Sequence, residues 1–162
     1  MNSLYLRIFI SVLAIIGLSP LVANMAAAKR LNWSIKLGTD EVRCFDQIYP
    51  ASQWNDSHSE EKMLADAKVA SGYLNRNGRR SYFFLIEGER WCGTAGCKLL
   101  IGEVEQAGIC RLLYDDDGSD NIDILQRRDH GYRRLYTPCE ARFDGQQYQQ
   151  LHPECPTVDI QR

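Results

Sequence analysis

A hydrophobic run opens the chain, without a charged residue from Ile8 to Val22. One positive charge, Arg7, precedes the run, and residues 26–28 are alanines of the size that a signal peptidase accepts. The run is about 15 residues long, shorter than the roughly 20 that a membrane-spanning helix needs. The pattern therefore predicts a cleavable secretory signal peptide over residues 1–28, with cleavage after Ala23 as an alternative, and a mature protein without a stable membrane anchor.

Further along the chain, apolar side chains recur at helical intervals. Ser57 and Glu60 have the spacing of a capping box, and the pattern that follows predicts one amphipathic helix over residues 58–75. Its apolar positions are Met63, Leu64, Ala67, Ala70, Tyr73 and Leu74. Asn77-Gly78 provides the stop signal. The preceding residues, 29–56, suit a short strand followed by a short helix or loop.

Beyond residue 80, aromatic and β-branched residues alternate with frequent turn signals, as in an antiparallel meander. Strands are predicted near residues 81–87, 98–105, 108–114, 121–126, 132–136, 140–144 and 147–151. Tight hairpins are predicted at residues 106–108 and at Asp144-Gly145, and a turn at residues 115–119. The expected fold class is α+β, an antiparallel β-meander with one main helix packed on it and stapled by disulfides. Residues 29–156 would form a single domain, and residues 157–162 a C-terminal tail.

All six cysteines lie behind the predicted signal peptide, at Cys44, Cys92, Cys97, Cys110, Cys139 and Cys155. An even number in a chain bound for an oxidising compartment predicts disulfide bonds, for which fifteen pairings exist. Spacing supports only the pairing of Cys92 with Cys97, because the four residues between them include two glycines and can fold back to disulfide distance. For the other four, we expect Cys110 to pair with Cys139 and Cys44 with Cys155. Zinc is the alternative use of cysteine, but it favours two matching close pairs, and the chain has one.

The charge balance of the mature chain is nearly even. Without the segment that contains Arg7, 18 basic and 21 acidic side chains remain, a formal charge of −3. Nucleic acids and anionic membranes attract proteins with a basic field, so neither is expected as the main partner. The arginines at residues 76–80 and 127–128 are interpreted as solvated turns.

The most distinctive segment is Trp91 with the loop that follows it, Cys92-Gly93-Thr94-Ala95-Gly96-Cys97. Glycine permits positive φ and leaves backbone N–H and C=O groups uncovered, and a disulfide would make the loop a rigid knuckle. The candidate binding residues are therefore Trp91, Gly93, Thr94, Ala95 and Gly96. The alternative is a stapled turn that only stabilises the core. The spacing differs from that of thioredoxin-type redox sites, which place two residues between their cysteines.

A second candidate is the segment from Gly131 to Tyr136, in which Tyr132 and Arg133 fall on a predicted strand. A tyrosine on a sheet face can keep its hydroxyl group in water, and tyrosine and arginine are both enriched at protein interfaces. Tyr132 and Arg133 are therefore candidate binding residues. The alternative is that the tyrosines of these strands pack in the core.

An acidic run and three histidines are weaker indications of metal binding or catalysis. The acidic run from Asp115 to Asp123 has the alternating oxygen ligands of a calcium loop, but Asp120 stands where such loops need glycine and the closing glutamate is missing. The histidines, at His58, His130 and His152, have no nucleophile or metal motif beside them. We therefore predict no catalytic residues, no metal site and no cofactor.

The Cys92–Cys97 loop, Gly-Tyr-Arg-Arg-Leu at residues 131–135 and Phe-Asp-Gly-x-x-Tyr at residues 143–148 together resemble a pattern in small exported bacterial proteins of uncharacterised function. This resemblance implies a periplasmic α+β domain. The order of elements and the C-x4-C spacing also resemble, more loosely, the periplasmic inhibitor of vertebrate lysozyme, in which a disulfide-closed loop enters the enzyme's cleft. That loop carries charged and imidazole side chains, where this chain has small residues at 93–96.

These observations lead to a functional hypothesis. We expect a non-enzymatic binding protein, periplasmic or secreted and of inhibitor or immunity type. It would contact a protein of the cell envelope, such as a cell-wall hydrolase or toxin, through the Cys92–Cys97 loop. One alternative is a structural or envelope-stress accessory domain whose disulfides serve stability alone. Another is a glycan or small-ligand binder that uses Trp91 and exposed tyrosines.

Overall fold

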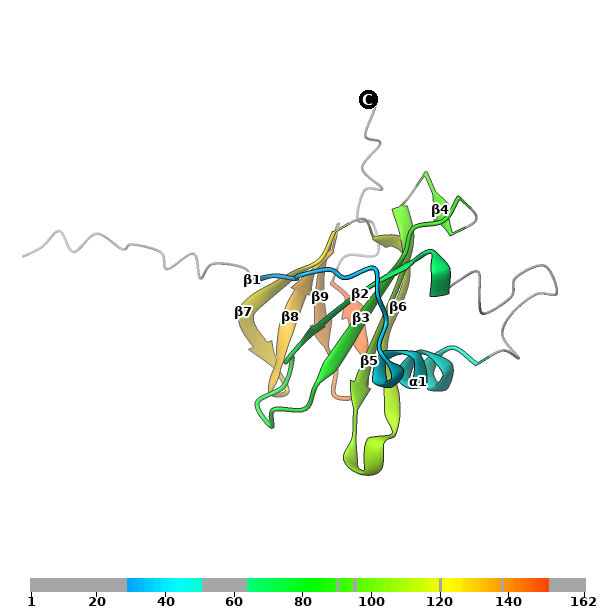
Figure 1. Cartoon of the computed structure of the whole chain (residues 1–162). Coiled ribbons are helices and arrows are strands. Elements are labelled where there is room, and N and C mark those ends of the chain that lie inside the picture. The colour runs from blue at the N-terminus through cyan, green and yellow to red at the C-terminus, as the bar shows by residue number, and fades with distance from the viewer. Residues whose placement is uncertain are drawn as a thin grey trace, which may run out of the picture.

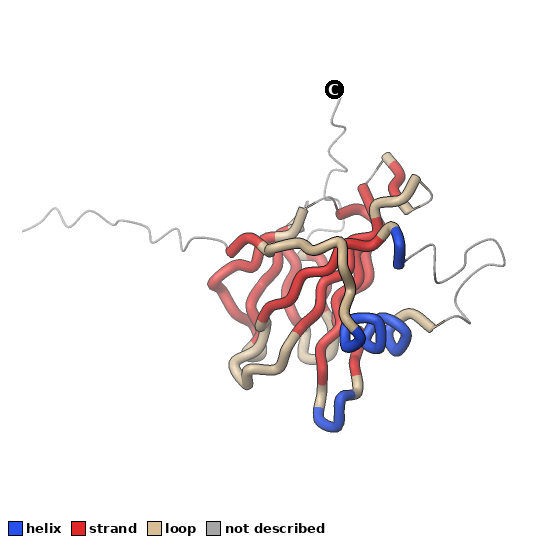
Figure 2. The backbone as a smooth tube through the Cα atoms, in the orientation of Figure 1, coloured by secondary structure: helices blue, strands red, loops and turns tan. Residues whose placement is uncertain are grey.

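The computed structural model describes residues 29–50, 64–89, 91–94, 96–119, 121–137 and 139–151. The predicted signal peptide, residues 1–28, and the predicted tail, residues 157–162, lie outside this part of the chain. Figure 1 and Figure 2 show two β-sheets packed together, with a helix on the outer side of one of them. In the described residues, no helix is long and apolar enough to cross a membrane.

Both sheets are antiparallel. Sheet A has the order β1, β7, β8, β9, β10, with bounds Lys29–Arg30, Asp123–Asp129, Tyr132–Tyr136, Glu140–Phe143 and Tyr148–Gln150. Sheet B has the order β2, β3, β5, β4, with β6 also paired to β5. Its strands span Ala67–Gly72 (β2), Ser81–Ile86 (β3), Cys92–Gly93 (β4), Gly96–Val104 (β5) and Cys110–Ser119 (β6). The helix α1 spans Thr39–Ile48, and a 3₁₀ turn, η2, spans Gln106–Gly108.

Sheet B is covered on both faces, and this creates two hydrophobic cores. Successive side chains of a strand point to opposite faces, so that Phe83 of β3 packs between the sheets while Phe84 packs against the helix. The inter-sheet core also includes Leu31, Ala70, Leu74, Leu99, Ile101, Leu113, Tyr114, Ile122, Ile124, Leu135, Ala141, Phe143 and Tyr148. The helix-side core also includes Cys44, Phe45, Ile48, Ala67, Val69, Tyr82, Ile86, Leu100 and Cys110. Burial on both faces explains why β3 is a nearly continuous apolar run.

Helix α1 is the element that covers the outer face of sheet B. Its buried side chains are Cys44, Phe45 and Ile48, whose spacing places them on one side of a helix. The ring of Phe45 meets that of Phe84 edge to face, with centroids 5.3 Å apart. The side-chain oxygen of Gln47 accepts a hydrogen bond of 2.5 Å from the backbone N–H of Cys110 on β6. The helix is therefore fastened to the sheet by both apolar and polar contacts.

The prediction of a helix over residues 58–75 is wrong from Ala67 onward. Residues 64–65 are helical, but strand β2 begins at Ala67 and pairs with β3 along its whole length, from Ala67 opposite Ile86 to Gly72 opposite Ser81. Residues 58–63 lie outside the described residues. Small residues fit either period, and pairing with β3 buries Val69 and Ala70 on opposite faces of sheet B, which a helix at this position would not achieve. The main helix lies instead in the segment interpreted as a short strand followed by a short helix or loop.

The predicted turn at residues 115–119 is also wrong, because strand β6 continues through it to Ser119. Lys98 on the neighbouring strand β5 forms ion pairs with Asp115 and, at 2.9 Å, with Asp117. This pairing lowers the repulsion between the two carboxylates and lets the acidic run remain in the sheet. The turn propensity of aspartate is overridden by strand pairing.

The remaining strand predictions agree with the structure to within a few residues. The hairpin predicted at residues 106–108 is η2, in which Ala107 and Gly108 have φ values of 66° and 77°. In the hairpin between β9 and β10, Asp144 accepts hydrogen bonds from the backbone N–H groups of Gln146 and Gln147. The fold class is confirmed in its coarse form, mostly antiparallel sheet with one described α-helix, whereas the position of the helix is corrected.

Between described residues, two disulfide bonds are defined: Cys92–Cys97, as the spacing predicts, and Cys44–Cys110. The expected pairs Cys110–Cys139 and Cys44–Cys155 are therefore wrong. Cys139 is also disulfide-bonded. These bonds indicate an oxidising, extracytoplasmic environment.

The Cys44–Cys110 bond joins the helix to sheet B across a sequence separation of 66 residues. Gly102 of β5 lies directly beneath it, where an added Cβ atom would come within 2.7 Å of both sulfur atoms. The absence of a side chain at this position is what lets the disulfide approach the sheet. The pairing thus depends on the packing of α1 and could not be read from cysteine spacing.

Three tyrosines of the inter-sheet region should make the protein sensitive to alkaline pH. Burial raises the pKa values of Tyr114, Tyr132 and Tyr148, with a further contribution at Tyr132 from its hydrogen bond to Glu103. The unfolded chain then releases these protons near pH 10 while the folded chain retains them, so stability is complete below pH 10 and falls as pH rises above it. We expect the free energy of unfolding in urea to decrease between pH 9 and 11. The Tyr148→Phe variant should show a smaller decrease, and an equal one would contradict this assignment.

Candidate functional site

The stapled loop is a two-stranded projection at one end of sheet B. Strand β4 pairs with the start of β5, with Cys92 opposite Cys97 and Gly93 opposite Gly96. Gly96 has a φ of 121°, a conformation that favours glycine. Gly93 and Thr94 are exposed, and an added Cβ at Gly93 would meet nothing within 4 Å. The loop therefore presents a small, open surface at its tip.

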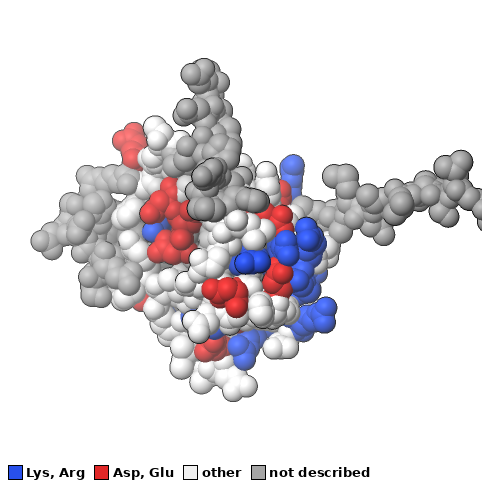
Figure 3. Space-filling model, turned by 180° about the vertical axis from the view of Figure 1, so that it is seen from behind, with Lys and Arg blue, Asp and Glu red and all other residues white. Residues whose placement is uncertain are grey.

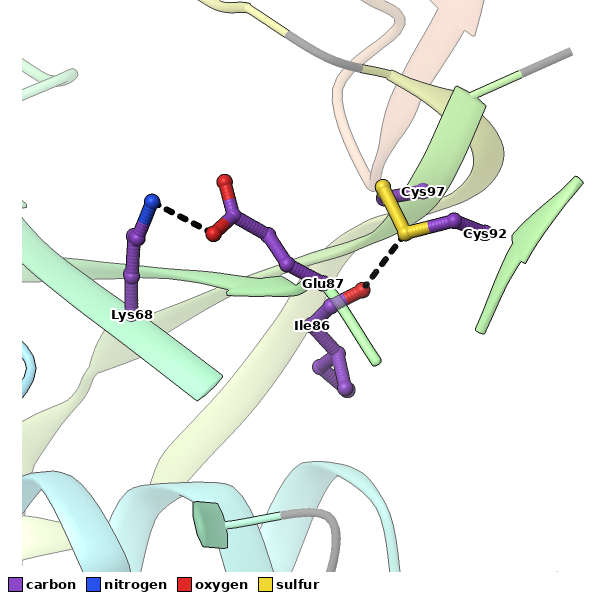
Figure 4. The surroundings of a disulfide bond; sticks show 5 residues. All are labelled: Lys68, Ile86, Glu87, Cys92 and Cys97. Carbon is purple, nitrogen blue, oxygen red and sulfur yellow. Dashed lines mark hydrogen bonds and ion pairs between the residues drawn. A yellow bond between two sulfur atoms is a disulfide. The ribbon is translucent and has the colours of Figure 1, made fainter. Parts of the chain in front are cut away.

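Backbone hydrogen bonds hold the base of this loop. The carbonyl of Gly88 accepts bonds from the N–H groups of Trp91 (2.7 Å) and Cys92 (3.1 Å), and Lys98 N–H donates to the Trp91 carbonyl at 3.0 Å. Figure 4 shows the Cys92 sulfur facing the carbonyl oxygen of Ile86, at 3.8 Å, where β3 ends. The loop is thus fixed at its base by hydrogen bonds as well as by its disulfide.

Trp91 lies at the base of the loop and not at its exposed tip. Its side chain is half-buried and packs against the helix-side core. Of the predicted binding residues, Gly93 and Thr94 are exposed and Gly96 is buried, whereas Ala95 lies outside the described residues. Among the described residues of the loop, the exposed surface is therefore formed by Gly93 and Thr94.

Ion pairs surround the loop base on sheet B. Lys68 pairs with Glu87 beside the disulfide (Figure 4). Lys98 follows Cys97 directly, and its ammonium group lies 5.7 Å from the ring centroid of Tyr49 at the end of α1. Burial opposes the charge of Lys98, but hydrogen bonds to Asp115 and Asp117 raise its pKa overall. These pairs fasten the loop base to β2, β6 and the helix.

The other two predicted binding residues are not near the loop. Strand β5 begins at Gly96 beside the loop and runs to Val104 near the η2 hairpin, and Figure 1 shows β4 and that hairpin at opposite ends of the molecule. Tyr132 lies at the η2 end, where its hydroxyl group donates a 2.6 Å hydrogen bond to Glu103 of β5. Arg133 donates its backbone N–H to Leu74 at the same end. The structure therefore separates the candidates into two sites.

Tyr132 is a structural residue in this arrangement. Its ring stacks on Phe143, with centroids 3.9 Å apart, and it packs against the inter-sheet core. Its hydroxyl group is committed to Glu103. The interpretation of Tyr132 as a core residue is thus favoured over its use on a recognition face.

Glu103 is the centre of a polar cluster that the sequence analysis missed. Its side chain is fully buried, with 0% exposed, yet it carries a carboxylate. Besides Tyr132, the side-chain amide of Asn75 donates to it, and the guanidinium groups of Arg79 and Arg111 each lie 3.7 Å away. Both carboxylate oxygens are thus occupied by partners within the chain, and the cluster ties the β2–β3 loop, β5, β6 and β8 together.

The sequence does contain a pattern that predicts the burial of Glu103. It lies two and four residues beyond Ile101 and Leu99, so the alternation of β5 places it on the same inward face as these core residues. A carboxylate at an inward position requires partners, because an unpaired buried charge is strongly destabilising. Their identity could not be read from the sequence, since Asn75 and Tyr132 come from separate strands and loops.

The described part of the chain lacks a metal-binding cluster. No group of three or more His, Cys, Asp or Glu side chains there is placed to hold a metal ion. Asp115 and Asp117, which belong to the acidic run considered for calcium, are paired with Lys98.

No protein-family model, curated protein or solved structure matches the chain.

Proposed function

We propose that this is an exported, non-enzymatic binding protein that presents the Cys92–Cys97 loop to a protein partner of the cell envelope. The proposal places it in the periplasm or outside the cell. The partner is of the hydrolase or toxin class, on which a protein of inhibitor or immunity type acts. The resemblance of the C-x4-C spacing to that of the lysozyme inhibitor family supports this partner class.

The main support for this proposal is the short length of the loop that the Cys92–Cys97 bond closes. The two cysteines are 5 residues apart, and they already face each other in the β4–β5 pair. A bond across so short a loop removes less chain entropy than one across a long loop, so its main effect is local rigidity. Rigidity before binding lowers the entropy lost on association, which favours a recognition role.

The shape of the tip agrees with such a role. Gly93 and Thr94 carry small side chains, so a partner's side chains can approach the backbone N–H and C=O groups closely. Shape complementarity and main-chain hydrogen bonds, rather than charge, would then provide the affinity. This differs from the charged wedge of the lysozyme inhibitor family and predicts a different contact chemistry.

The first test is capture of a partner from the native envelope fraction by tagged, oxidised mature protein. We expect one stoichiometric partner to be retained by the wild type and lost by Thr94→Arg, because a long charged side chain at the tip blocks close approach. Ser71→Arg, a comparable change at an exposed position of β2, is the control and should retain the partner. Isothermal titration with the captured partner then gives the change in affinity.

Two outcomes would argue against the proposal. If both arginine variants retain the partner equally, the loop is not the contact surface. If the folded wild-type protein captures nothing, the disulfides serve stability alone and a structural role replaces the binding role.

A further inference from the structure

Two arginines are cross-strand neighbours in sheet A and, in the part of the chain that the structure describes, have no acidic partner. Arg128 of β7 is the direct cross-strand neighbour of Arg133 of β8, so their side chains share one face of the sheet. Like charges in this position destabilise a strand pair. Within the described residues, neither guanidinium group has a carboxylate within 4.0 Å, the ion-pair distance. This arrangement of two positive charges is unfavourable unless a negatively charged group compensates them.

Neutral groups of the chain hold both guanidinium groups in place. Arg128 donates to the backbone carbonyls of Leu74 (3.0 Å) and Gly131 (2.8 Å). Arg133 donates to the side-chain oxygen of Gln126 at 3.1 Å, and its Nε is buried without a hydrogen-bond partner. Neutral acceptors orient these groups while leaving their positive charges unneutralised.

A third arginine stands beside this pair. Arg76 is exposed and follows Leu74 by two residues in the β2–β3 loop, whose contact with β8 is fixed by the 2.8 Å bond from Arg133 N–H to the Leu74 carbonyl. The Leu74 carbonyl also accepts a bond from Arg128, so both strands contact the loop segment that carries Arg76. Burial lowers the pKa of Arg128, and the positive charges of Arg133 and Arg76 lower it further. Three separate segments thus bring their charges to one place.

Asp129, Glu140 and Glu103 are engaged by groups other than this pair. Asp129, next to Arg128 in the sequence, binds Arg134 through both carboxylate oxygens, at 2.5 and 3.0 Å. Glu140 also binds Arg134, and Glu103 is held by Asn75 and Tyr132. In Figure 3, Lys and Arg side chains gather along the side of the molecule on which β7 and β8 lie. This concentration of positive charge contrasts with the acidic balance of the whole chain.

We propose that Arg76, Arg128 and Arg133 form a binding site for a phosphate group. A planar carboxylate is satisfied by one guanidinium group through two parallel hydrogen bonds. Three guanidinium groups from three segments match instead a tetrahedral anion, which has more oxygens and carries up to two negative charges. The site lies at the opposite end of the molecule from the Cys92–Cys97 loop, so it is independent of the proposed partner contact.

The test uses the oxidised mature protein and inorganic phosphate as the probe, with chloride at matched ionic strength as the reference. We expect phosphate to shift the amide NMR signals of Gly131 and Arg133 and to raise the melting temperature. Arg76→Gln should weaken phosphate binding about tenfold or more, as expected for loss of a charge-assisted hydrogen bond. Arg76 is exposed and makes no described ion pair, so this variant leaves the fold intact. Arg127→Gln, at an exposed position of β7 next to Arg128, is the matched control and should bind like the wild type.

A second arm separates a soluble phosphate from a lipid headgroup. Vesicles containing phosphatidic acid are compared with vesicles of phosphatidylcholine alone, using wild type, Arg76→Gln and Arg127→Gln. The proposal is supported if binding depends on Arg76 and not on Arg127. Binding of free phosphate then identifies a soluble phosphate as the ligand, and binding of phosphatidic acid vesicles alone identifies a lipid headgroup. The absence of binding in both arms, or equal weakening by the two substitutions, overturns the proposal. Arg128→Gln, checked for folding by circular dichroism, should abolish the same binding.

Discussion

We expect the Cys44→Ala, Cys110→Ala double variant to unfold with a free energy about 4 kcal/mol lower than that of the oxidised wild type. The reason is that this disulfide closes a loop with a sequence separation of 66 residues, and the entropy removed from the unfolded chain grows with loop length. The bond also fastens α1 over sheet B, where both cysteines are buried. Denaturation in guanidinium chloride, followed by circular dichroism, measures the change. Alanine is preferred to serine because it places no hydroxyl group in the helix-side core.

The matched control is the Cys92→Ser, Cys97→Ser double variant. Its cysteines are 5 residues apart, so the same reasoning gives a loss of about 2 kcal/mol. The critical result is therefore which of the two double variants loses more free energy of unfolding. A larger loss on removal of the short bond would show that the Cys92–Cys97 loop is a main stabilising element and would contradict its proposed role in recognition.

The second large effect concerns Glu103. We expect Glu103→Ala to lower the free energy of unfolding by about 3 to 5 kcal/mol, because removing one member of a buried charged cluster leaves the others without compensation. The groups left behind are Asn75, Tyr132, Arg79 and Arg111, of which the last two are about one-third exposed. Their partial exposure favours the lower end of this range, since water can solvate the freed guanidinium groups. Urea denaturation at pH 7 gives the value.

Two further variants test whether the cluster acts as a unit. Tyr132→Phe keeps the ring that stacks on Phe143 and removes only the hydroxyl group, so we expect a loss of about 1.5 to 3 kcal/mol, typical of a hydrogen bond to a charged group. When it is combined with Glu103→Ala, the two losses should be far from additive, since both remove the same bond. A Glu103→Ala loss below about 1 kcal/mol, or additive losses in the double variant, would refute the view that Glu103 organises this end of the sandwich.

The sequence predicted the Cys92–Cys97 bond at one candidate site, but it did not reveal the surroundings of Tyr132 and Arg133 at the other. The Cys92–Cys97 loop is a local feature, so its disulfide and its exposed Gly93 and Thr94 could be anticipated from six consecutive residues. Tyr132 and Arg133 are adjacent in sequence, yet they belong to different surroundings. Tyr132 reaches Glu103 in the interior, whereas Arg133 faces Arg128 across the strand pair. Such neighbours become visible only when the strands are paired.

The sequence by itself determined the features that depend on a few neighbouring residues. Runs of aromatic and β-branched residues separated by turn signals specify β3 and the strands from β5 onward, because such residues fit the pleated surface of a sheet. The turns at residues 106–108 and at Asp144-Gly145 follow from backbone freedom and from aspartate's ability to bond its own backbone. The Cys92–Cys97 bond follows from close spacing.

Only the tertiary structure decided the features that require partners distant in sequence. Residues 67–72 form a strand because β3 offers hydrogen bonds and two hydrophobic faces, although their spacing also fits a helix. Cys44 pairs with Cys110 because α1 packs over β6, and Glu103 is stable in the interior because Asn75 and Tyr132 meet it there. Each of these outcomes depends on groups brought together by the packing of sheets and helix, and local residue patterns do not encode which groups will meet.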